Sequence, residues 1–366
     1  DFPLFKEVPD MKKVDITESM VQQVARKMKG SAGPGGTDSN QITHLLCDNK
    51  ASKKLRTARA KLVEWLANEN PPYAAYRAQK VLRGIALGKN PGVRPLGIGE
   101  TWARCDAKCL LKATGMEVKE KCDIDQLCSG LEAGVEAGVH AARLLWEQHQ
   151  QEEEWGFLLV DAENAFNLQN RALMLWTVRH EWPSGARYVF NNYKHQAIIV
   201  FRGNDGTASF LSSKEGVTQG DPLAMSAYAV GMLPLIRLLK KAFPDVFQTW
   251  FADDGRGGAF LKRLAEWWKM ICLEGPKFGY YPNSSKSIIV VHPDNLEAAG
   301  KIFLDLGFQY ENIHTGARFL GGFIGMDADH DAWLKEKIEG LESYCVRVIT
   351  GCPQIPTDHL LSLIHI

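Results

Sequence analysis

Two adjacent aspartates, Asp253 and Asp254, lie between an apolar run and a glycine-rich stretch in the segment WFADDGRGGAF. A third, Asp161, ends the apolar run WGFLLV, which has the pattern of a strand covered on both faces. Carboxylates packed close together repel one another unless a divalent cation lies among them. The sequence therefore predicts a hairpin at Asp253 and a metal site where sheet strands end.

Magnesium is the cation that this donor set favours. Mg²⁺ takes oxygen ligands and usually shares its coordination between one or two carboxylates and substrate phosphates. Two such ions can stabilise both the attacking and the leaving oxygen of a phosphoryl transfer. For an isolated ADD segment, the plain alternative is a solvated turn.

The elements that must position these carboxylates follow from the hydrophobic pattern. Residues 15–30 predict a helix that ends at Gly30, and residues 39–89 predict mainly helix with a break at Pro71 and Pro72. The remaining helices are expected at 101–121, 130–151, 170–182, 221–243 and 265–279. Strands are expected at the end of NPGVRPLGIGE and at 155–160, 198–214, 247–261, 287–292 and 317–325. A helical N-terminal third thus precedes an α+β core with a mixed or antiparallel sheet.

Charge is distributed unevenly along a chain whose formal net charge is zero. Residues 50–112 contain fourteen Lys and Arg against four Asp and Glu, whereas 123–154 contain one Arg against eight acids. This asymmetry predicts a basic surface for a polyanion, and the segment KKLRTARAK suits phosphate contact. Helices that merely alternate in charge are the simpler explanation.

Cysteine usage and hydropathy indicate the compartment. The eight cysteines form no CxxC pair, which predicts reduced, mostly buried thiols in an intracellular protein, nuclear or cytoplasmic. The longest apolar run, AMSAYAVGMLPLI, is too short to span a bilayer, so no membrane partner is expected. The chain begins at Asp1 and is expected to be a fragment, and the final LSLIHI is excluded from the fold.

Five segments occur in an order that resembles the polymerase motifs of reverse transcriptases, most like those of non-LTR retrotransposons. They are LLVDAENAFN, GVTQGDPLAMSAYAV, WFADDG, FGYYPNSSKS and FLGGFIG. Residues 31–108 extend the resemblance through SAGPGGTD and GVRPLGIGETWARCDAK, so it covers about residues 30–325. The sequence departs from the family at Phe251, where Tyr is more usual, and at GRGG, which is expected to be flexible and to bring Arg256 near the metals.

The resemblance implies an α+β right-hand polymerase with fingers and palm, a helix-rich N-terminal part and an antiparallel palm sheet with packed helices. The implied divisions are an N-terminal helical extension at 1–30, fingers at 31–155, palm with interleaved fingers elements at 156–325, and a truncated thumb at 326–366.

The family's functional residues are carried over by motif. Asp161, Asp253 and Asp254 would bind the metals, and Lys286 would protonate the pyrophosphate leaving group. The implied nucleotide-binding residues are Lys89, Arg94, Phe166, Gln219 and Gly220, with Phe166 as the aromatic gate beneath the sugar. The basic segment predicts Lys53, Lys54, Arg56 and Arg59 as nucleic-acid contacts, and Arg104 and Lys108, four apart on a helix, are expected to touch template backbone or solvent. The resemblance implies further contacts at Gly321 and Gly322 in a primer grip.

The function implied by the resemblance is RNA-directed DNA polymerisation, in which Mg²⁺, with Mn²⁺ as the alternative cation, assists transfer of dNMP to a primer 3′-OH. Its partners would be an RNA template, a DNA primer or nicked target DNA, and dNTPs. Two alternatives stay open: an RNA-directed RNA polymerase, and a catalytically inactive, nucleic-acid-binding relic of a retroelement. The segment FADD and the aromatic Phe166 argue against the first, and the intact aspartates argue against the second.

Overall fold

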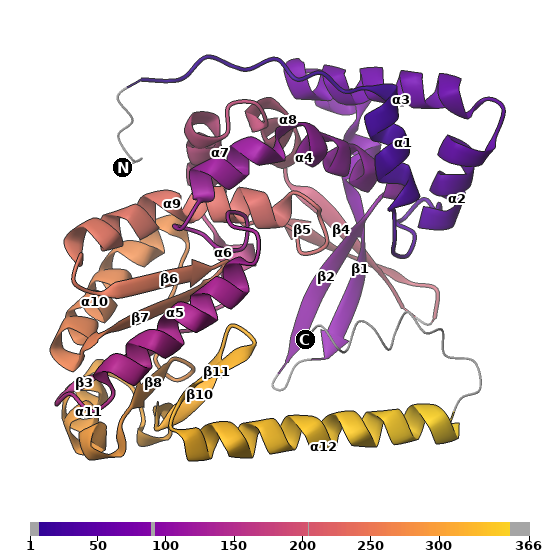
Figure 1. Cartoon of the computed structure of the whole chain (residues 1–366). Coiled ribbons are helices and arrows are strands. Elements are labelled where there is room, and N and C mark those ends of the chain that lie inside the picture. The colour runs from indigo at the N-terminus through magenta and orange to yellow at the C-terminus, as the bar shows by residue number, and fades with distance from the viewer. Residues whose placement is uncertain (1–6, 89–91, 204, 352–366) are drawn as a thin grey trace. The chain divides into compact units, whose positions relative to one another are not determined.

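The computed structural model describes residues 7–88, 92–203 and 205–351 (Figure 1). The chain forms two compact units, each assembled from three segments. The first unit comprises Asp1–Glu132, Ala162–Ala242 and Met270–Pro282, and the second comprises Ala133–Asp161, Phe243–Lys269 and Asn283–Ile366. The expected domain divisions remain predictions, since these units divide the chain by contacts and not by function.

The first unit is helix-rich and contains one four-stranded sheet. Its sheet has the order β2-β1-β4-β5, in which β1 pairs antiparallel with β2 and parallel with β4. The strands are β1 (Val81–Gly88), β2 (Val93–Gly99), β4 (Ala197–Arg202) and β5 (Ala208–Ser213). The helices are α1 (Glu18–Arg26), α2 (Ser39–Thr43), α3 (Ser52–Asn68), α4 (Thr101–Cys122), α6 (Ala165–Leu168), α7 (Arg171–Glu181), α8 (Ala186–Tyr193) and α9 (Ala224–Ala242).

Local chemistry explains where these helices begin and which is most buried. The Thr17 hydroxyl accepts a hydrogen bond from the Met20 N–H and so caps α1, and Asp38 and Gln41 form a reciprocal capping box at α2. Helix α9 is apolar on most sides and is largely buried despite the internal Pro234. The predicted helix at 221–243 is thus confirmed, apart from its first turn.

One expectation for this unit is wrong. Residues 81–88 lie in the predicted helical stretch 39–89 but form β1, which pairs with β2 from Leu82–Gly99 to Gly88–Val93. Glycine is a poor helix former, and β1 contains Gly84 and Gly88. A Cβ at Gly84 would lie 2.6 Å from the Phe201 ring, so this position needs glycine to fit against β4.

The second unit is built on a five-stranded sheet of order β6-β7-β3-β8-β9. All neighbours are antiparallel except β8 and β9, so the expected antiparallel sheet is confirmed with one parallel pair. The strands are β3 (Trp155–Val160), β6 (Phe247–Phe251), β7 (Asp254–Phe260), β8 (Ile288–Val291) and β9 (Ile313–His314), with a separate hairpin of β10 (Gly316–Phe319) and β11 (Gly322–Gly325).

Helix α5 (Gly134–His149) and the β10–β11 hairpin cover one face of this sheet (Figure 1). Their core contains Trp146 of α5, Phe157 and Leu159 of β3, and Phe319 of β10, all buried. Within the second unit, Trp267 in the middle of α10 (Leu261–Glu274) packs edge-on against Trp250 of β6, with ring centroids 6.0 Å apart. The buried strand β3 therefore lies in the middle of a hydrophobic core, as its sequence predicts.

Two further helices complete the second unit. They are α11 (Leu296–Phe303), which the hydrophobic pattern did not indicate, and α12 (Asp327–Gly351), which follows the β10–β11 hairpin (Figure 1). The expected truncated thumb falls partly on α12 and partly on residues 352–366, outside the described residues. Among the described helices, none combines the length and apolar character that a bilayer span requires.

Candidate active site

The hairpin β6–β7 places Asp253 at its tip. Phe251 pairs with Asp254, so Ala252 and Asp253 form a two-residue turn. Such turns need positive φ angles, and Ala252 has φ +53° although it is not glycine. Residues held in this region are strained and commonly lie at functional sites. The predicted hairpin is confirmed, and its backbone presents the two aspartates where strand pairing ends.

Asp161 follows β3 directly, beside the same hairpin. Val160 pairs with Gly255, so continuing the register by one residue places Asp161 opposite Asp254. The Asp161 N–H donates to Ser287 Oγ at 3.0 Å, and its carbonyl accepts from the Asn283 N–H at 2.9 Å. The structure thus brings two sequence-distant aspartates to one edge of the sheet and anchors the backbone of one of them.

The expected flexibility of GRGG is wrong, because these glycines are buried under aromatic rings. A Cβ at Gly255 would lie 2.6 Å from the Trp250 ring, and one at Gly258 would lie 2.7 Å from the Phe157 ring. The glycines make room for large side chains on both faces of β7. The sequence did place Arg256 correctly near the carboxylates, since its Nη2 lies 3.1 Å from Asp254 Oδ2.

Lys286 lies in the turn that holds Asp161. The Lys286 N–H donates to the Asn283 carbonyl at 3.2 Å, and the Asn283 side chain accepts from Ser285. Lys286 is exposed, which a proton donor to a leaving group requires. Sequence reasoning missed the supporting residues Asn283 and Ser287, although both stand in the motif segment PNSSKS.

The chemistry of the donor set fits a divalent cation. The set contains carboxylates only, which suits Mg²⁺, an ion that needs one or two protein carboxylates beside phosphate oxygens. No group of three or more His, Cys, Asp or Glu side chains in the described part of the chain has metal-binding geometry. Asp254 contacts Arg256 instead. The arrangement thus fits a site in which two aspartates hold metal together with a substrate.

The Gln219–Gly220 loop lies in the first unit and pairs with β2. The Gly97 N–H donates to the Gln219 carbonyl at 3.1 Å. Gly220 has φ +108°, and a Cβ there would lie 2.5 Å from the Gly97 carbonyl oxygen. The following Asp221 accepts from Tyr193 at 2.6 Å and from the Leu223 N–H at 2.9 Å. The loop is therefore held from both sides and needs glycine at position 220.

Phe166 lies on the short helix α6 of the first unit. Its ring stacks on Tyr228 of α9, with centroids 4.4 Å apart and an angle of 12° between the planes. Tyr228 is buried, whereas Phe166 stays partly exposed. A partly exposed ring that stacks on a buried one suits the predicted gate, whose role stays a prediction.

The other predicted nucleotide contacts are less defined. Arg94 lies in β2, opposite Leu87. Lys89 lies outside the described residues.

The predicted primer grip lies in the second unit. Gly321 has φ +88°, and a Cβ there would meet no atom within 4 Å. A Cβ at Gly322 would lie 2.8 Å from Val139 of α5. Of these two glycines, Gly321 therefore has the open space beside it.

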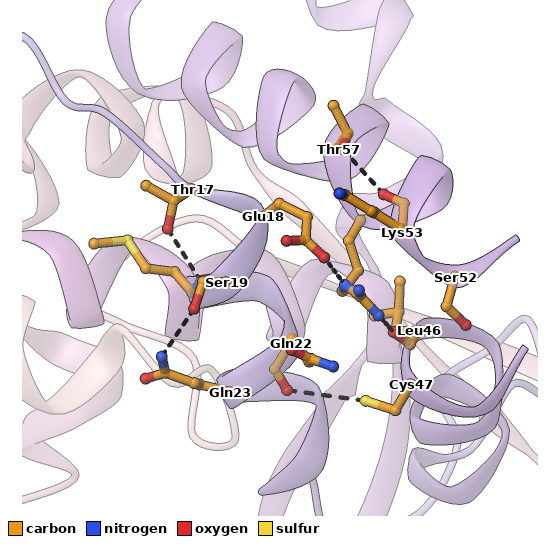
Figure 2. A network of polar contacts seen from close by, with 12 residues as sticks. Thr17, Glu18, Ser19, Gln22, Gln23, Leu46, Cys47, Ser52, Lys53 and Thr57 are labelled. Carbon is orange, nitrogen blue, oxygen red and sulfur yellow. Dashed lines mark hydrogen bonds and ion pairs between the residues drawn. The ribbon is translucent and has the colours of Figure 1, made fainter. Parts of the chain in front are cut away.

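Two of the predicted nucleic-acid contacts, Arg56 and Arg59, have partners inside the protein, and their contact with nucleic acid stays a prediction. Arg56 forms an ion pair with Glu18 and donates to the Leu46 carbonyl at 2.5 Å, and Figure 2 shows Glu18 and Leu46 in this network. Arg59 donates twice to the fully buried Asp106, at 2.6 Å through Nε. Burial raises the pKa of Asp106 to about 6, and Arg59 opposes that rise. These arginines stabilise the helices.

The remaining predicted contacts stay accessible. Lys53 and Lys54 are exposed at the start of α3, and Lys108 is partly exposed on α4. Arg104 donates to the Ser31 carbonyl at 2.5 Å and lines a cavity of about 50 Å³ together with Lys80 and His195. Burial lowers the pKa of Arg104, and the positive charge of Arg83 lowers it further. Sequence reasoning missed Lys80, which carries no motif signal.

Comparisons with known proteins agree with the ordered motifs. No family model matches the chain. Over 252 residues, 68% of the chain, it is 24% identical to the retrotransposable element SLACS 132 kDa protein of Trypanosoma brucei gambiense, and it spans 20% of that protein.

Solved structures of telomerase resemble the fold. Apo telomerase from Candida tropicalis has a TM-score of 0.50 at 10% identity, over 70% of this chain and 48% of that one. Telomerase from Candida albicans with a TWJ fragment of telomeric RNA has a TM-score of 0.48 at 9% identity, over 78% and 55% of the two chains. The chain thus spans about half the length of these telomerases and a fifth of the retrotransposon protein.

The motif order, the retrotransposon relative and the α+β fold support one another. The strained hairpin at Asp253, the strand end at Asp161 and the glycine loop at Gly220 lie where the motifs predict them. The resemblance predicted from the sequence is confirmed: this chain resembles a reverse transcriptase domain in sequence and has the fingers-and-palm fold of such a polymerase.

Proposed function

We propose that this chain is the polymerase domain of a retroelement and catalyses RNA-directed DNA synthesis. The observation that carries the proposal is the pairing of β3 with β7, which sets Asp161 beside the turn that contains Asp253. Two carboxylates at one sheet edge can hold divalent metal against the phosphates of an incoming nucleotide. The similarity to a retrotransposon protein supports RNA as the template.

The chain's own residues would divide the work as follows. Asp161 and Asp253 supply oxygen ligands, and Mg²⁺, or Mn²⁺ in its place, would stabilise the charge that develops during phosphoryl transfer. Lys286, exposed on the turn bonded to Asp161, donates a proton to the pyrophosphate. Gln219 and Gly220 support the incoming nucleotide and the template base. Phe166 packs beneath the sugar of the incoming nucleotide. Arg94, with Lys89, grips the triphosphate.

A primer-extension assay tests this proposal on an RNA template with a DNA primer, dNTPs and Mg²⁺ or Mn²⁺. Asp253→Asn should lower the extension rate by about a thousandfold, because phosphoryl transfer depends on positioning and charge neutralisation. The matched control is Asp245→Asn in the same unit, because Asp245 forms an exposed ion pair with Arg263. Asp245→Asn should extend primers like the parent.

Each alternative predicts a distinct result in this assay. A relic would bind RNA but give no extension with the parent chain. An RNA polymerase would use rNTPs in preference to dNTPs. Equal extension by the parent and Asp253→Asn would show that the site has been assigned to the wrong residues.

A further inference from the structure

Arg256 is a buried arginine that contacts one of the three aspartates. Its side chain is only 10% exposed, whereas that of Asp254 is 47% exposed. Arg256 Nη2 lies 3.1 Å from Asp254 Oδ2, and Nη1 donates to the Asp254 carbonyl at 3.3 Å. One guanidinium therefore binds both the side chain and the backbone of the residue that begins β7.

Strand geometry fixes which side of the sheet this contact occupies. Residues two apart on a strand point to the same face, as do residues directly opposite in an antiparallel pair. Arg256 is opposite Leu159, whose side chain lies in the core beside Phe319. The Arg256 guanidinium accordingly lies over the Phe319 ring, 5.1 Å from its centroid. The continued register places Asp161 on the same face, beyond Arg256 and opposite Asp254.

This position is costly for an arginine unless its charge is used. Burying a guanidinium removes it from water, and a single partly exposed ion pair only partly offsets that cost. Among the described residues, Arg256 Nε is buried without a hydrogen-bond acceptor. Arginine stays protonated in proteins, so the charge cannot be removed by titration. The charge contacts the Asp254 carboxylate, and the register places Asp161 on the same face of the sheet.

We propose that Arg256 is a built-in counter-cation of the carboxylate group, which holds Asp254 by ion pairing and competes with divalent metal. It is a positioning residue: Asp161 and Asp253 are the main metal ligands, and Asp254 joins them only by leaving Arg256. The inference rests on the metal site of the proposed function. It goes further in assigning Arg256 a role and in separating Asp254 from the other two aspartates.

Mn²⁺ binding to the 366-residue chain, measured by electron paramagnetic resonance, tests the role directly. Arg256→Gln removes the positive charge and should tighten Mn²⁺ binding about tenfold, because a unit charge a few ångström away interacts strongly with a divalent ion. Arg256→Met is a second neutral variant whose unbranched stem can keep the contact with Phe319. Arg256→Lys keeps the charge and should bind Mn²⁺ within about threefold of the parent.

Thermal unfolding gives a readout that does not depend on binding assays. Without metal, both neutral variants should melt below the parent, because they lose the ion pair between Arg256 and Asp254. Mg²⁺ should raise their Tm by more than it raises that of the parent, since binding to the folded state stabilises it. A neutral variant that folds only with metal would also support the role. Neutral variants that stay unfolded with metal would overturn it.

Arg263→Gln is the matched control, because Arg263 belongs to the same unit. Its ion pairs are with Asp245 and Glu266, and neither is one of the three aspartates of the proposed metal site. It should leave Mn²⁺ affinity unchanged. Unchanged or weaker Mn²⁺ binding by folded Arg256→Gln and Arg256→Met would overturn the inference even if the parent extends primers. Conversely, a parent that binds Mn²⁺ but extends no primer would defeat the proposed polymerase function and leave this inference standing.

Discussion

Phe166 combines a stacked aromatic partner with partial exposure to solvent. Tyr228 stacks under the ring at 4.4 Å, and the partly exposed side chain leaves room for a ligand. A rigid ring against the 2′ position of a sugar tolerates hydrogen but collides with a hydroxyl. Phe166→Val should therefore raise the rate of rNTP relative to dNTP incorporation by about ten- to a hundredfold. The two rates on one RNA template give this ratio.

Stability separates this role from simple packing. Truncation of a fully buried Phe to Ala costs about 3 to 5 kcal/mol, and partly exposed Phe166 cut to Val should cost less, about 1 to 2 kcal/mol. Phe190→Val controls for the loss of an aromatic ring elsewhere in the same unit, because Phe190 of α8 is exposed. A folded, active Phe166→Val with the parental ratio would remove the gate and favour the RNA-polymerase alternative.

Individual charges show where sequence reading reaches its limit. The count of basic residues predicted Arg59 as a phosphate contact, but its partner Asp106 lies 47 residues away and is fully buried. A charge count contains no information on partners that folding brings together. The same holds for Arg256, whose nearness to the aspartates was predictable from adjacency, whereas its contact with Phe319 of β10 was not.

At the scale of elements, the Gln219–Gly220 loop depends on a close approach between two backbones. A Cβ at Gly220 would lie 2.5 Å from the Gly97 carbonyl oxygen, so Gly220→Ala must push the loop from β2. Because the loop supports the nucleotide in the proposed function, primer extension should fall by about a hundredfold or more, the cost of a misplacement of about 1 Å. Steady-state extension rates at saturating dNTP measure this effect.

Gly206→Ala is a control with the same backbone demand. Gly206 has φ +82° in the β4–β5 turn, similar to φ +108° at Gly220, but a Cβ there would meet no atom within 4 Å. Both variants bear the strain of a positive φ, about 1 to 2 kcal/mol, and only Gly220→Ala adds a collision. Equal activity of the two variants would show that loop placement does not limit the reaction.

Element types were predictable where the pattern was strong. The buried strand β3, the helix α9 and the hairpin β6–β7 lie where the sequence places them. The sequence predicted helix where strand β1 forms. Strand β1 is stabilised by pairing with β2 along its length, and the local sequence pattern of β1 does not show this pairing. The glycines of β7 looked flexible for a related reason: the rings of Trp250 and Phe157 that cover them come from neighbouring strands.

At the scale of the molecule, the order of motifs was more informative than any single one. Each unit is assembled from three chain segments, so neither can be read as one stretch of sequence. The aspartates of the proposed metal site and Lys286 belong to the second unit, and Phe166, Gln219 and Gly220 belong to the first. Family resemblance could relate these residues, since it compares whole ordered sets, whereas periodicity and charge describe only neighbours along the chain.

In the proposed function, attraction to RNA would come from local charge, because the formal net charge of the whole chain is zero. Arg56 and Arg59 have partners inside the protein, which leaves Lys53, Lys54 and Lys61 as the exposed cations of the predicted phosphate-binding segment. Each phosphate contact to single-stranded nucleic acid contributes about −0.7 to the slope of log affinity against log salt. Lys53→Gln/Lys54→Gln should therefore make the slope shallower by about 1.4, measured by fluorescence anisotropy with labelled RNA.

The control must change net charge equally and lie elsewhere. Lys262→Gln/Lys301→Gln does so in the second unit, where these lysines are 73% and 72% exposed and pair with Glu154 and Glu297. If charge anywhere on the surface drives binding, both double variants will change the slope alike. If α3 contacts the RNA backbone, only the Lys53/Lys54 variant will change it. An unchanged slope in that variant would exclude Lys53 and Lys54 from the RNA contact.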